Sequence, residues 1–360
     1  MKRTLVILLG CCLGVNSCYE LDLNPLSQAS SENWYSSETE IEMSVKDFYR
    51  DDFWPLDNED KTDNFIYRET PSEILKGTFN GQSDDVTKLW ANQYKSIARA
   101  NTILANMDKA VNMGISEVKL KQYEGEAFFQ RASCYARLVT YFGDVIYVTE
   151  VVDIDKAFTL GRTAKSEIVP KIYEDYDKAI ENLPEKYSGL SSQRATKGAA
   201  LALKARFALY MGDWDIVADA TKKCMDLGIY KLHKDYSDLF LSTTKNSEES
   251  IFLLPRSIEY KVTLGNWTVM NEVSRNPGGW GAFAPSWDLL AAYTCTDGLP
   301  IDESPLFDPH NPFKNRDPRC TATIVEFGTR HLGFEYNPHP DAVQVMNYNC
   351  LLYTSDAADE

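Results

Sequence analysis

Ala-Ala-Leu-Ala-Leu-Lys-Ala-Arg-Phe-Ala-Leu-Tyr-Met-Gly-Asp-Trp, residues 199–214, is the stretch that decides the fold of this chain. Apolar residues recur in it at helical spacing, and its many small residues let two antiparallel helices approach closely. Gly212 ends the first helix, and Asp213 caps the next one. We therefore predict a tight helix hairpin here. The expected inward residues are Thr196, Ala200, Leu203, Phe207 and Tyr210 in the first helix, and Trp214, Val217, Thr221 and Met225 in the second.

Three further amphipathic helices precede this hairpin. In each, residues of one face recur at alternating steps of three and four, and the second and third stop at Gly143 and Pro184. The hairpin resembles a tetratricopeptide hairpin, and five helices in series predict a mainly α-helical scaffold, which usually binds partners. The three faces are Trp90, Tyr94, Ile97, Asn101 and Leu104; Phe128, Ala132, Tyr135, Val139 and Phe142; and Val169, Ile172, Tyr176, Ala179 and Leu183.

After about Tyr230 the residue pattern and composition of the sequence change. Helical periodicity fades, and prolines, glycines and aromatic residues crowd together, as in Pro277-Gly278-Gly279-Trp280-Gly281. Long irregular segments of this kind usually lie over a rigid scaffold and supply binding surface. We therefore predict a loop-rich second part. Its tryptophans Trp267, Trp280 and Trp287 could bind a ligand or could anchor the loops onto the helices.

The first two dozen residues are typical of a secretion signal. A positive start at Lys2-Arg3 is followed by an apolar run that is too short to span a bilayer. Cys18 follows the small Ser17 and is the expected lipid acceptor of a bacterial lipoprotein, which makes residues 1–17 the predicted signal peptide. Cys11 is a rival acceptor, but it would leave a shorter apolar core. An ordinary cleaved signal with an incidental cysteine is the alternative.

The composition argues against several classes of function. A net charge of −16 disfavours nucleic-acid binding, because the phosphate backbone must be met by lysine and arginine. The four histidines lack the spacing of metal ligands, and no phosphate-binding loop or nucleophile motif occurs. We expect no catalytic residue, no metal and no cofactor. Cys134 and Cys224 fall on apolar helical faces, whereas Cys295 and Cys320 could form a disulfide that no spacing rule supports.

Short stretches along the chain resemble the SusD/RagB family of outer-membrane nutrient-binding lipoproteins. Each stretch is modest, but their order and spacing together are specific. Family members commonly carry proline where this chain has Tyr147, and they usually continue well beyond its end. The matching stretches are Ser17-Cys18 with residues 21–25, Asp63-Asn64, Trp90 with Tyr94, Ile97 and Asn101, residues 125–132, 141–145 and 199–206, residues 285–290 with Tyr293 and Asp297-Gly298, and residues 315–319.

The resemblance implies an α-helical fold of tetratricopeptide-like hairpins with a loop-rich second part. It divides the chain into a helical domain at residues 18–235 and an incomplete C-terminal domain at residues 250–349. It also implies a surface-exposed, lipid-anchored protein of the cell outer membrane. Such a protein captures glycans, peptides or glycoproteins and hands them to a SusC-type TonB-dependent transporter, without catalysis. The alternative is a helical-repeat assembly scaffold that binds only protein and has no glycan ligand.

The residues suited to a glycan site are aromatic platforms with polar neighbours. Sugars present apolar C–H faces and a rim of hydroxyl groups, so they need exposed tryptophan or tyrosine beside Asn, Asp or Arg. For Asp63-Asn64 a turn or structural cap is the favoured alternative. Family binding residues cannot be transferred by position, because these sites vary with the ligand. The candidates are Trp267 with Asn266, Trp280, and Tyr67 with Arg68 and Asn64.

Residues 350–360 are predicted not to be of biological origin. A DNA string that looks like a sequencing-library transposon end would encode the first ten of them, and the family resemblance stops before they begin. The preceding residues 343–349 resemble a strand that is cut in mid-course. We expect the natural protein to continue past Asn349.

Overall fold

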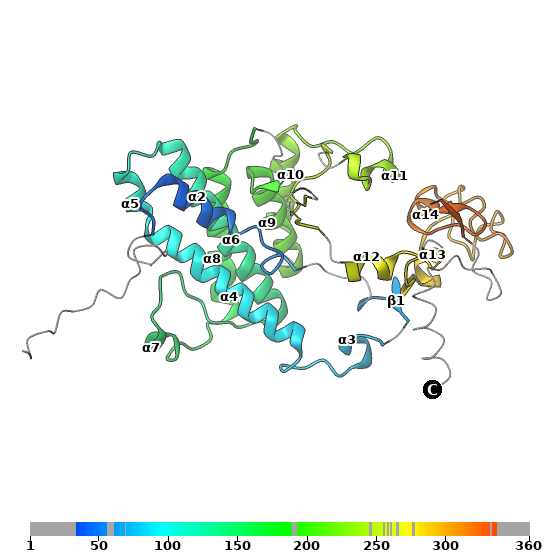
Figure 1. Cartoon of the computed structure of the whole chain (residues 1–360), viewed down its shortest axis with the longest axis horizontal. Helices are drawn as coiled ribbons and strands as arrows, with labels where there is room; N and C mark the ends of the chain where they lie inside the picture. Colours follow the sequence, from blue (N-terminus) through cyan, green and yellow to red (C-terminus); the bar gives the residue numbers. More distant parts are fainter. Residues whose placement is uncertain are drawn as a thin grey trace, which may run out of the picture.

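The computed structural model describes residues 34–336, apart from 56–60, 69, 189–192, 245–246, 255, 258, 260, 264–265, 276–277 and 332. Cys18, the predicted signal peptide and residues 350–360 therefore lie outside the described residues. Long helices form one body, and short elements joined by loops form the rest (Figure 1). The longer helices are α2 (Glu38–Lys46), α4 (Asp84–Ala105), α6 (Glu117–Phe142), α8 (Lys165–Asn182), α9 (Lys197–Met211) and α10 (Trp214–Asp226). The short elements are β1 (Phe65–Tyr67), α3 (Glu73–Lys76), α5 (Met107–Asn112), α7 (Ile154–Ala157), α11 (Tyr236–Leu239), η3 (Ser242–Thr244), α12 (Asn266–Glu272), β2 (Phe283–Pro285), α13 (Trp287–Ala292), α14 (Arg319–Thr323), β3 (Arg330–His331) and β4 (Phe334–Glu335).

The predicted hairpin is present as α9 and α10. The side chain of Thr196 accepts a hydrogen bond from the Ala199 N–H at 3.1 Å and caps the start of α9. Gly212 has a φ of 81°, a left-handed conformation that glycine adopts without a Cβ penalty, and α10 begins two residues later. The interface between the two helices is small and apolar. It is formed by Leu201, Ala205, Ala220 and Cys224.

The inward face of α10 differs from the predicted one. The helix packs mainly on α9, and the stripe that makes this contact runs through Ala220 and Cys224. The expected stripe is shifted around the helix axis, because periodicity shows that an apolar face exists but does not show which side meets a neighbour. Asp213 precedes α10 as predicted, but its carboxylate accepts from the Tyr173 hydroxyl at 2.5 Å and caps no backbone N–H. The residues expected inward that are exposed are Tyr210 (61%), Trp214 (66%), Thr221 and Met225 (68%).

Helix α6 is central to the helical body. Helices α4, α8 and α9 pack against it, and their apolar faces form the main core. The predicted faces of the three earlier helices are confirmed at Ile97, Tyr135, Val139, Ile172 and Tyr176, each of which is buried. Burial of apolar side chains is the dominant favourable term in folding. The predicted mainly α-helical scaffold is therefore confirmed, with its core where the periodicity places it.

A buried ion pair joins α6 to α8. Nε and Nη2 of Arg131 donate to the two carboxylate oxygens of Asp175 at 2.7 and 2.8 Å, and the two side chains are 6% and 5% exposed. Nη1 of Arg131 donates to Oδ1 of Asn101 at 2.9 Å. The amide of Asn101 in turn donates to the carbonyl oxygens of Val148 and Glu150. Burial of these charges is tolerated because each one is paired and hydrogen-bonded.

The loop-rich second part returns to the helical body and to its N-terminal loops. The ring of Phe252 lies 4.9 Å from Trp54 and 5.4 Å from Phe129, centroid to centroid, within the main core. Strand β2 pairs antiparallel with β1, with Phe65 opposite Pro285. In Figure 1, β1 and α3 therefore lie beside α12 and α13, although they precede α4 in the chain.

The four cysteines of the described chain are buried free thiols. Cys134 and Cys224 belong to apolar clusters in the helical body, as predicted. Cys295 and Cys320 are separate thiols, so the disulfide that the sequence left open is absent. Cys320 packs instead with Leu290 in a small apolar cluster of the second part.

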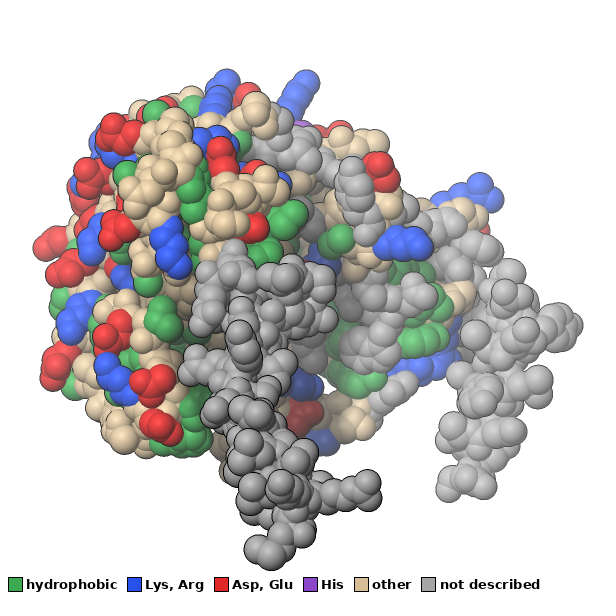
Figure 2. All heavy atoms as spheres, turned by 60° about the vertical axis from the view of Figure 1, so that its left-hand side comes forward, with side chains coloured by type: hydrophobic (Ala, Val, Ile, Leu, Met, Phe, Trp, Pro, Cys, Tyr) green, Lys and Arg blue, Asp and Glu red, His purple; other side chains and the backbone are tan. Residues whose placement is uncertain are grey.

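The surface of the helical body carries charges of both signs. Figure 2 shows acidic and basic side chains interspersed over this face. Several form exposed pairs one helical turn apart, such as Lys88 with Asp84 and Lys223 with Asp219. Pairs of this kind contribute little to stability. Within the described ranges, no helix is both long enough and apolar enough to cross a bilayer.

Candidate functional site

Ser286 joins the two parts of the chain where β1 pairs with β2. Its hydroxyl donates to the carbonyl oxygen of Asp63 at 2.5 Å, and its N–H donates to the carbonyl oxygen of Asn64 at 2.9 Å. The same hydroxyl accepts from the Leu289 N–H at 3.1 Å and caps α13. The position of Trp287, the first residue of α13, is therefore set by this serine.

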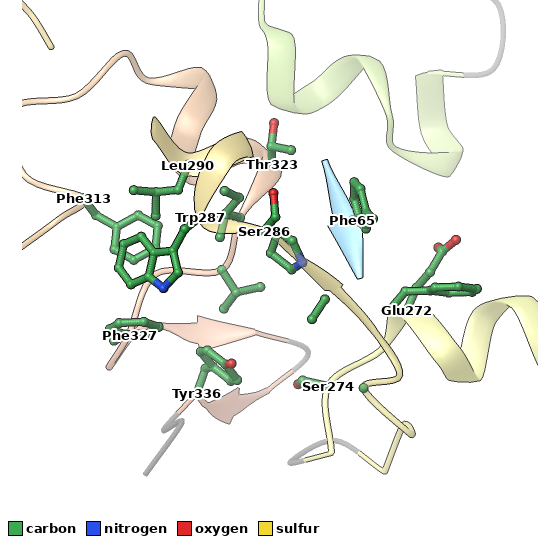
Figure 3. Close-up of a pocket in the computed structure, with 16 residues that line it drawn as sticks. Phe65, Glu272, Ser274, Ser286, Trp287, Leu290, Phe313, Thr323, Phe327 and Tyr336 are labelled. Carbon is green, nitrogen blue, oxygen red and sulfur yellow. The ribbon is translucent and has the colours of Figure 1, made fainter. Parts of the chain in front are cut away.

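An open cleft of about 670 Å³ lies beside the strand pair (Figure 3). In the view of Figure 3, Trp287, Phe327 and Tyr336 lie on one side of it, and Phe65 and Glu272 lie on the other. Trp287 is 68% exposed, and Phe327 is 49% exposed. The aromatic lining residues are Phe65, Phe283, Trp287, Phe313, Phe327 and Tyr336, and the polar ones are Glu272, Ser274, Ser286 and Thr323.

Buried Arg316 supports the wall of the cleft that carries Phe313. Its guanidinium donates to the carbonyl oxygens of Pro312 at 2.9 Å, Tyr293 at 2.6 Å and Leu290. Arg316 is 5% exposed, so it cannot reach a ligand in solvent. Its role is to tie the end of α13 to the loop that holds Phe313, because the last carbonyls of a helix need donors.

A second, smaller hollow of about 220 Å³ adjoins β1. It shares Phe65 and Ser286 with the larger cleft, so the strand pair borders both. Its other lining residues are Thr62, Asp63, Ile66, Tyr67, Pro71, Leu75 and Asp288.

The structure brings Asn64, Tyr67 and Arg68 next to residues 280–286. We call the contact between these two segments, where β1 pairs with β2, the seam. The ring of Tyr67 lies 5.0 Å from that of Phe283, centroid to centroid. The backbone N–H of Arg68 donates to the carbonyl oxygen of Ala282 at 2.9 Å. Asn64 accepts from Ser286 through its backbone, which agrees with a structural role for the Asp63-Asn64 turn. Tyr67 and Arg68 therefore remain candidates for contact with a ligand.

Trp280 lies in the loop that leads into β2. Its backbone N–H donates to the carbonyl oxygen of Met270 at 2.7 Å, and the residue is 37% exposed. Asn266 and Trp267 form the start of α12. The side chains of these two residues lie outside what the structure describes, so their assignment stays a prediction.

Sequence reasoning missed the aromatic residues that line the cleft. The sequence places Trp287 among three tryptophans that bind a ligand or anchor the loops, without singling it out, and it gives no indication of Phe327 or Tyr336. The Pro285-Ser286-Trp287 stretch carried a usable signal, because a serine that caps a helix leaves the next side chain at the helix start. No sequence pattern around Phe327 or Tyr336 indicates that they line the same cleft as Trp287.

Charged side chains of both signs lie near the strand pair: Arg68 and Arg275, Glu272 in the larger cleft, and Asp63 and Asp288 in the smaller hollow. Partial burial lowers the pKa of Arg275, and the nearby charge of Arg68 lowers it further. Glu272 is the acidic residue that lines the cleft. In the part of the chain that the structure describes, no three His, Cys, Asp or Glu side chains gather as a metal site. The arrangement is suited to holding a ligand by stacking and by hydrogen bonds.

A tetratricopeptide-like scaffold with an aromatic cleft at its loop-rich end defines a class of binding proteins. Residues 23–209 match the family model described as "Starch-binding associating with outer membrane". Residues 248–357 match the model described as "SusD family". Because the first match covers more than half of the chain, the chain belongs to the SusD family. The resemblance drawn from short sequence stretches is thereby confirmed.

Individual relatives agree with this assignment. SusD-like protein P25 of Formosa agariphila is 30% identical over 176 residues, which is 48% of this chain and 32% of that protein. The crystal structure of a SusD-like carbohydrate binding protein from Bacteroides fragilis has a TM-score of 0.74 and 27% identity, over 86% of this chain and 63% of that one. A second SusD-like protein from the same species has a TM-score of 0.69 and 25% identity. The chain thus spans less than two thirds of the length of these relatives.

Proposed function

We propose that this protein is a lipid-anchored, cell-surface protein that binds glycans and hands them to a SusC-type TonB-dependent transporter of the outer membrane. The family description and the carbohydrate-binding relative support the glycan ligand and the outer membrane. The observation that carries the proposal is the open cleft in which the Trp287 indole is 68% exposed. Indole rings offer a face on which the C–H surface of a sugar stacks.

The size and lining of the cleft suit an oligosaccharide segment. Its volume of about 670 Å³ falls within the roughly 300–1,000 Å³ that is usual for ligand sites. Apolar and aromatic side chains dominate the lining, and a few polar groups such as Ser274 and Thr323 can hydrogen-bond to hydroxyls. We assign Trp287 as the central platform, with Tyr67, Arg68 and Trp280 at the flank of the same seam.

A glycan array followed by calorimetry tests this assignment. For a glycan that the purified protein binds, Trp287→Ala should weaken binding by about 1–3 kcal/mol, as is typical when an aromatic hot-spot contact is lost. Trp214→Ala is the matched control, because Trp214 is also exposed, at 66%, but lies on α10. Equal affinity of both variants would reject the cleft as the site. Trp267→Ala and Trp280→Ala then show whether either of these residues adds a second platform.

A scaffold that binds only protein is the competing function. It is favoured by exposed apolar residues at the hairpin corner, where Leu209 is 47%, Tyr210 is 61% and Trp214 is 66% exposed. In our proposal this corner would contact the transporter. A chain that binds no glycan on the array but co-purifies with a membrane protein through this corner would support the scaffold instead.

The lipid anchor is tested at Cys18. Replacing Cys18→Ala should move the protein from the membrane fraction to the soluble fraction, because lipid attachment is what holds such a body at a bilayer. Metabolic labelling with a fatty-acid probe reports the attachment directly. Continued labelling of the variant would reassign the acceptor to Cys11 or Cys12.

A further inference from the structure

The end of α12 and the turn that follows it contain two buried hydrogen-bond donors that lack acceptors among the described residues. The side-chain amide nitrogen of Asn271 and the hydroxyl of Ser274 have no hydrogen-bond partner within the described residues. Asn271 is only 1% exposed. Arg275 makes no ion pair within the same ranges, and its Nε donates a long hydrogen bond of 3.4 Å to the carbonyl oxygen of Trp280. Buried polar groups are nearly always paired in folded proteins. Two unpaired buried donors and a guanidinium without an ion pair, all within five residues, point to a ligand that supplies acceptors.

A second arginine lies beside this turn. The N–H of Arg68 donates to the carbonyl oxygen of Ala282, and the N–H of Ala282 donates to that of Asn271, each at 2.9 Å. The residue after β1 and the end of α12 are therefore both hydrogen-bonded to the backbone of Ala282. Partial burial and the charge of Arg68 both lower the pKa of Arg275. The two like charges disfavour each other, and a bound anion offsets that repulsion at Arg275.

The turn opens onto the cleft. Ser274 and Gly281 both line it, and Cγ of Arg275 lies 3.7 Å from the position that a Cβ on Gly281 would take. Trp280, between the turn and β2, is 37% exposed. Glu272 is the acidic side chain of the lining, and Figure 3 shows its carboxylate pointing away from Ser274. The side of the cleft next to Ser274 therefore offers a hydroxyl donor, and Arg275 lies directly behind it, beside Gly281.

We propose that residues 271–275, the end of α12 and the turn after it, bind an anionic substituent, so that the ligand of the cleft is an acidic glycan that carries carboxylate or sulfate groups. Arg275 supplies the charged contact, and Ser274 supplies a neutral one. Guanidinium groups pair with planar carboxylates and with sulfate oxygens through charge-assisted hydrogen bonds, which are the strong ones. This inference rests on the proposed glycan-binding function and names the chemical class of its ligand.

Calorimetry with paired probes tests the inference. One pair is an oligogalacturonate and its fully methyl-esterified form, in which each carboxylate has become a neutral methyl ester. The other is a carrageenan oligosaccharide and its desulfated form. In at least one pair, the charged member should bind about tenfold or more tightly than its neutral form, as expected for a hydrogen bond to a charged group. The pair that shows the difference identifies the anionic group.

Variants of Arg275 then assign the contact. Arg275→Gln should remove the preference for the charged member, and Arg275→Lys should restore part of it, because lysine keeps the charge but loses the planar fork. Arg206→Gln is the matched control, since Arg206 is an exposed arginine on α9 and its loss changes the net charge equally. Circular dichroism and thermal melting of each variant establish that it is folded.

The outcomes separate this inference from the proposed function. Tight binding of neutral glycans that depends on Trp287, with no preference for either charged probe, overturns the acidic ligand and leaves the glycan site standing. A preference that survives Arg275→Gln in a folded variant overturns the role of the turn. Absence of binding to any glycan, charged or neutral, overturns both proposals.

Discussion

Trp54 and Trp287 show how differently the two regions of this protein use the same side chain. Trp54 is 9% exposed, lies 5.7 Å from the Phe129 ring, and donates its indole N–H to the carbonyl oxygen of Phe48 at 3.0 Å. Trp287 begins a helix of only six residues and is 68% exposed. Long helices cover one another's aromatic residues on all sides, whereas short elements joined by loops leave part of theirs in solvent. Aromatic residues therefore build the core in one region and offer a binding surface in the other.

The helical body also pairs its buried charges with one another. In the helical body, buried Glu126 forms an ion pair with Arg194 and accepts a hydrogen bond from the Tyr49 hydroxyl, and Arg131 forms an ion pair with Asp175. Within the described residues, the side-chain nitrogen of Asn271 and the hydroxyl of Ser274 in the second part have no hydrogen-bond partner, and neither has Oε1 of Gln130 in the helical body. A satisfied polar network rigidifies a core, whereas an unpaired buried group is costly. The contrast leads to three predictions about stability, beginning with the largest effect.

Replacement of the two tryptophans should separate core from surface most clearly. Trp54→Ala should lower the free energy of unfolding by about 3–5 kcal/mol, because it removes a large buried ring and leaves a cavity. Trp287→Ala should change it by less than about 0.5 kcal/mol, as for other surface substitutions. Urea unfolding followed by circular dichroism measures both. A large loss of stability in Trp287→Ala would mean that this indole belongs to a core, and the comparison would fail.

The buried ion pair offers a second test within the helical body. Asp175→Asn leaves the guanidinium of Arg131 buried without a counter-charge, and it should cost about 3 kcal/mol or more of unfolding free energy. Asp219→Asn is the matched control, because Asp219 pairs with Lys223 on the exposed face of α10, where the side chains are 55% and 61% exposed. The control should cost no more than about 0.5 kcal/mol. Equal effects of the two variants would contradict the role given to burial.

The tyrosines of the helical body should make it sensitive to alkali. Burial raises the pKa of Tyr147 to about 12, and the charge of Asp175 adds to the effect. Because an unfolded tyrosine ionises near pH 10, the stability from this phenol is complete below about pH 10 and is lost as the pH rises through about 12. Ultraviolet titration should show a phenolate transition near pH 12 that Tyr147→Phe removes. A Tyr147 transition near pH 10 would show that the ring is solvated.

Much of the fold follows from local patterns in the sequence. The 3.6-residue periodicity predicted the helices that became α4, α6, α8, α9 and α10, and Gly212 marked the corner of the hairpin. It did not predict which side of α10 meets α9, because Trp214 and Ala220 lie on adjacent stripes and only packing distinguishes them. The second part was recognised as loop-rich from its prolines and glycines, but such residues show where regular structure stops and not where the chain goes next.

The candidate site was predicted only in part. Tyr67, Arg68 and Trp280 were chosen for their chemistry, and the structure brings them to one seam. The lining residues Trp287, Phe327 and Tyr336 were missed, because their role depends on contacts between loops. Ligand binding by any of these residues and by Asn64, Asn266 and Trp267 remains a prediction, as does lipidation at Cys18.

The sequence by itself determined the helical scaffold, the change of residue pattern near Tyr230 and the family, since each is carried by residues close together in the chain or by motifs in a set order. Only the tertiary structure decided that β1 pairs with β2, that an open cleft lies beside them, and that Arg275 has no ion-pair partner among the residues the structure describes. The physical reason is that helix periodicity is a property of neighbouring residues. Exposure, pairing and charge balance depend instead on segments such as residues 63–68 and 271–287, which meet only when the chain has folded.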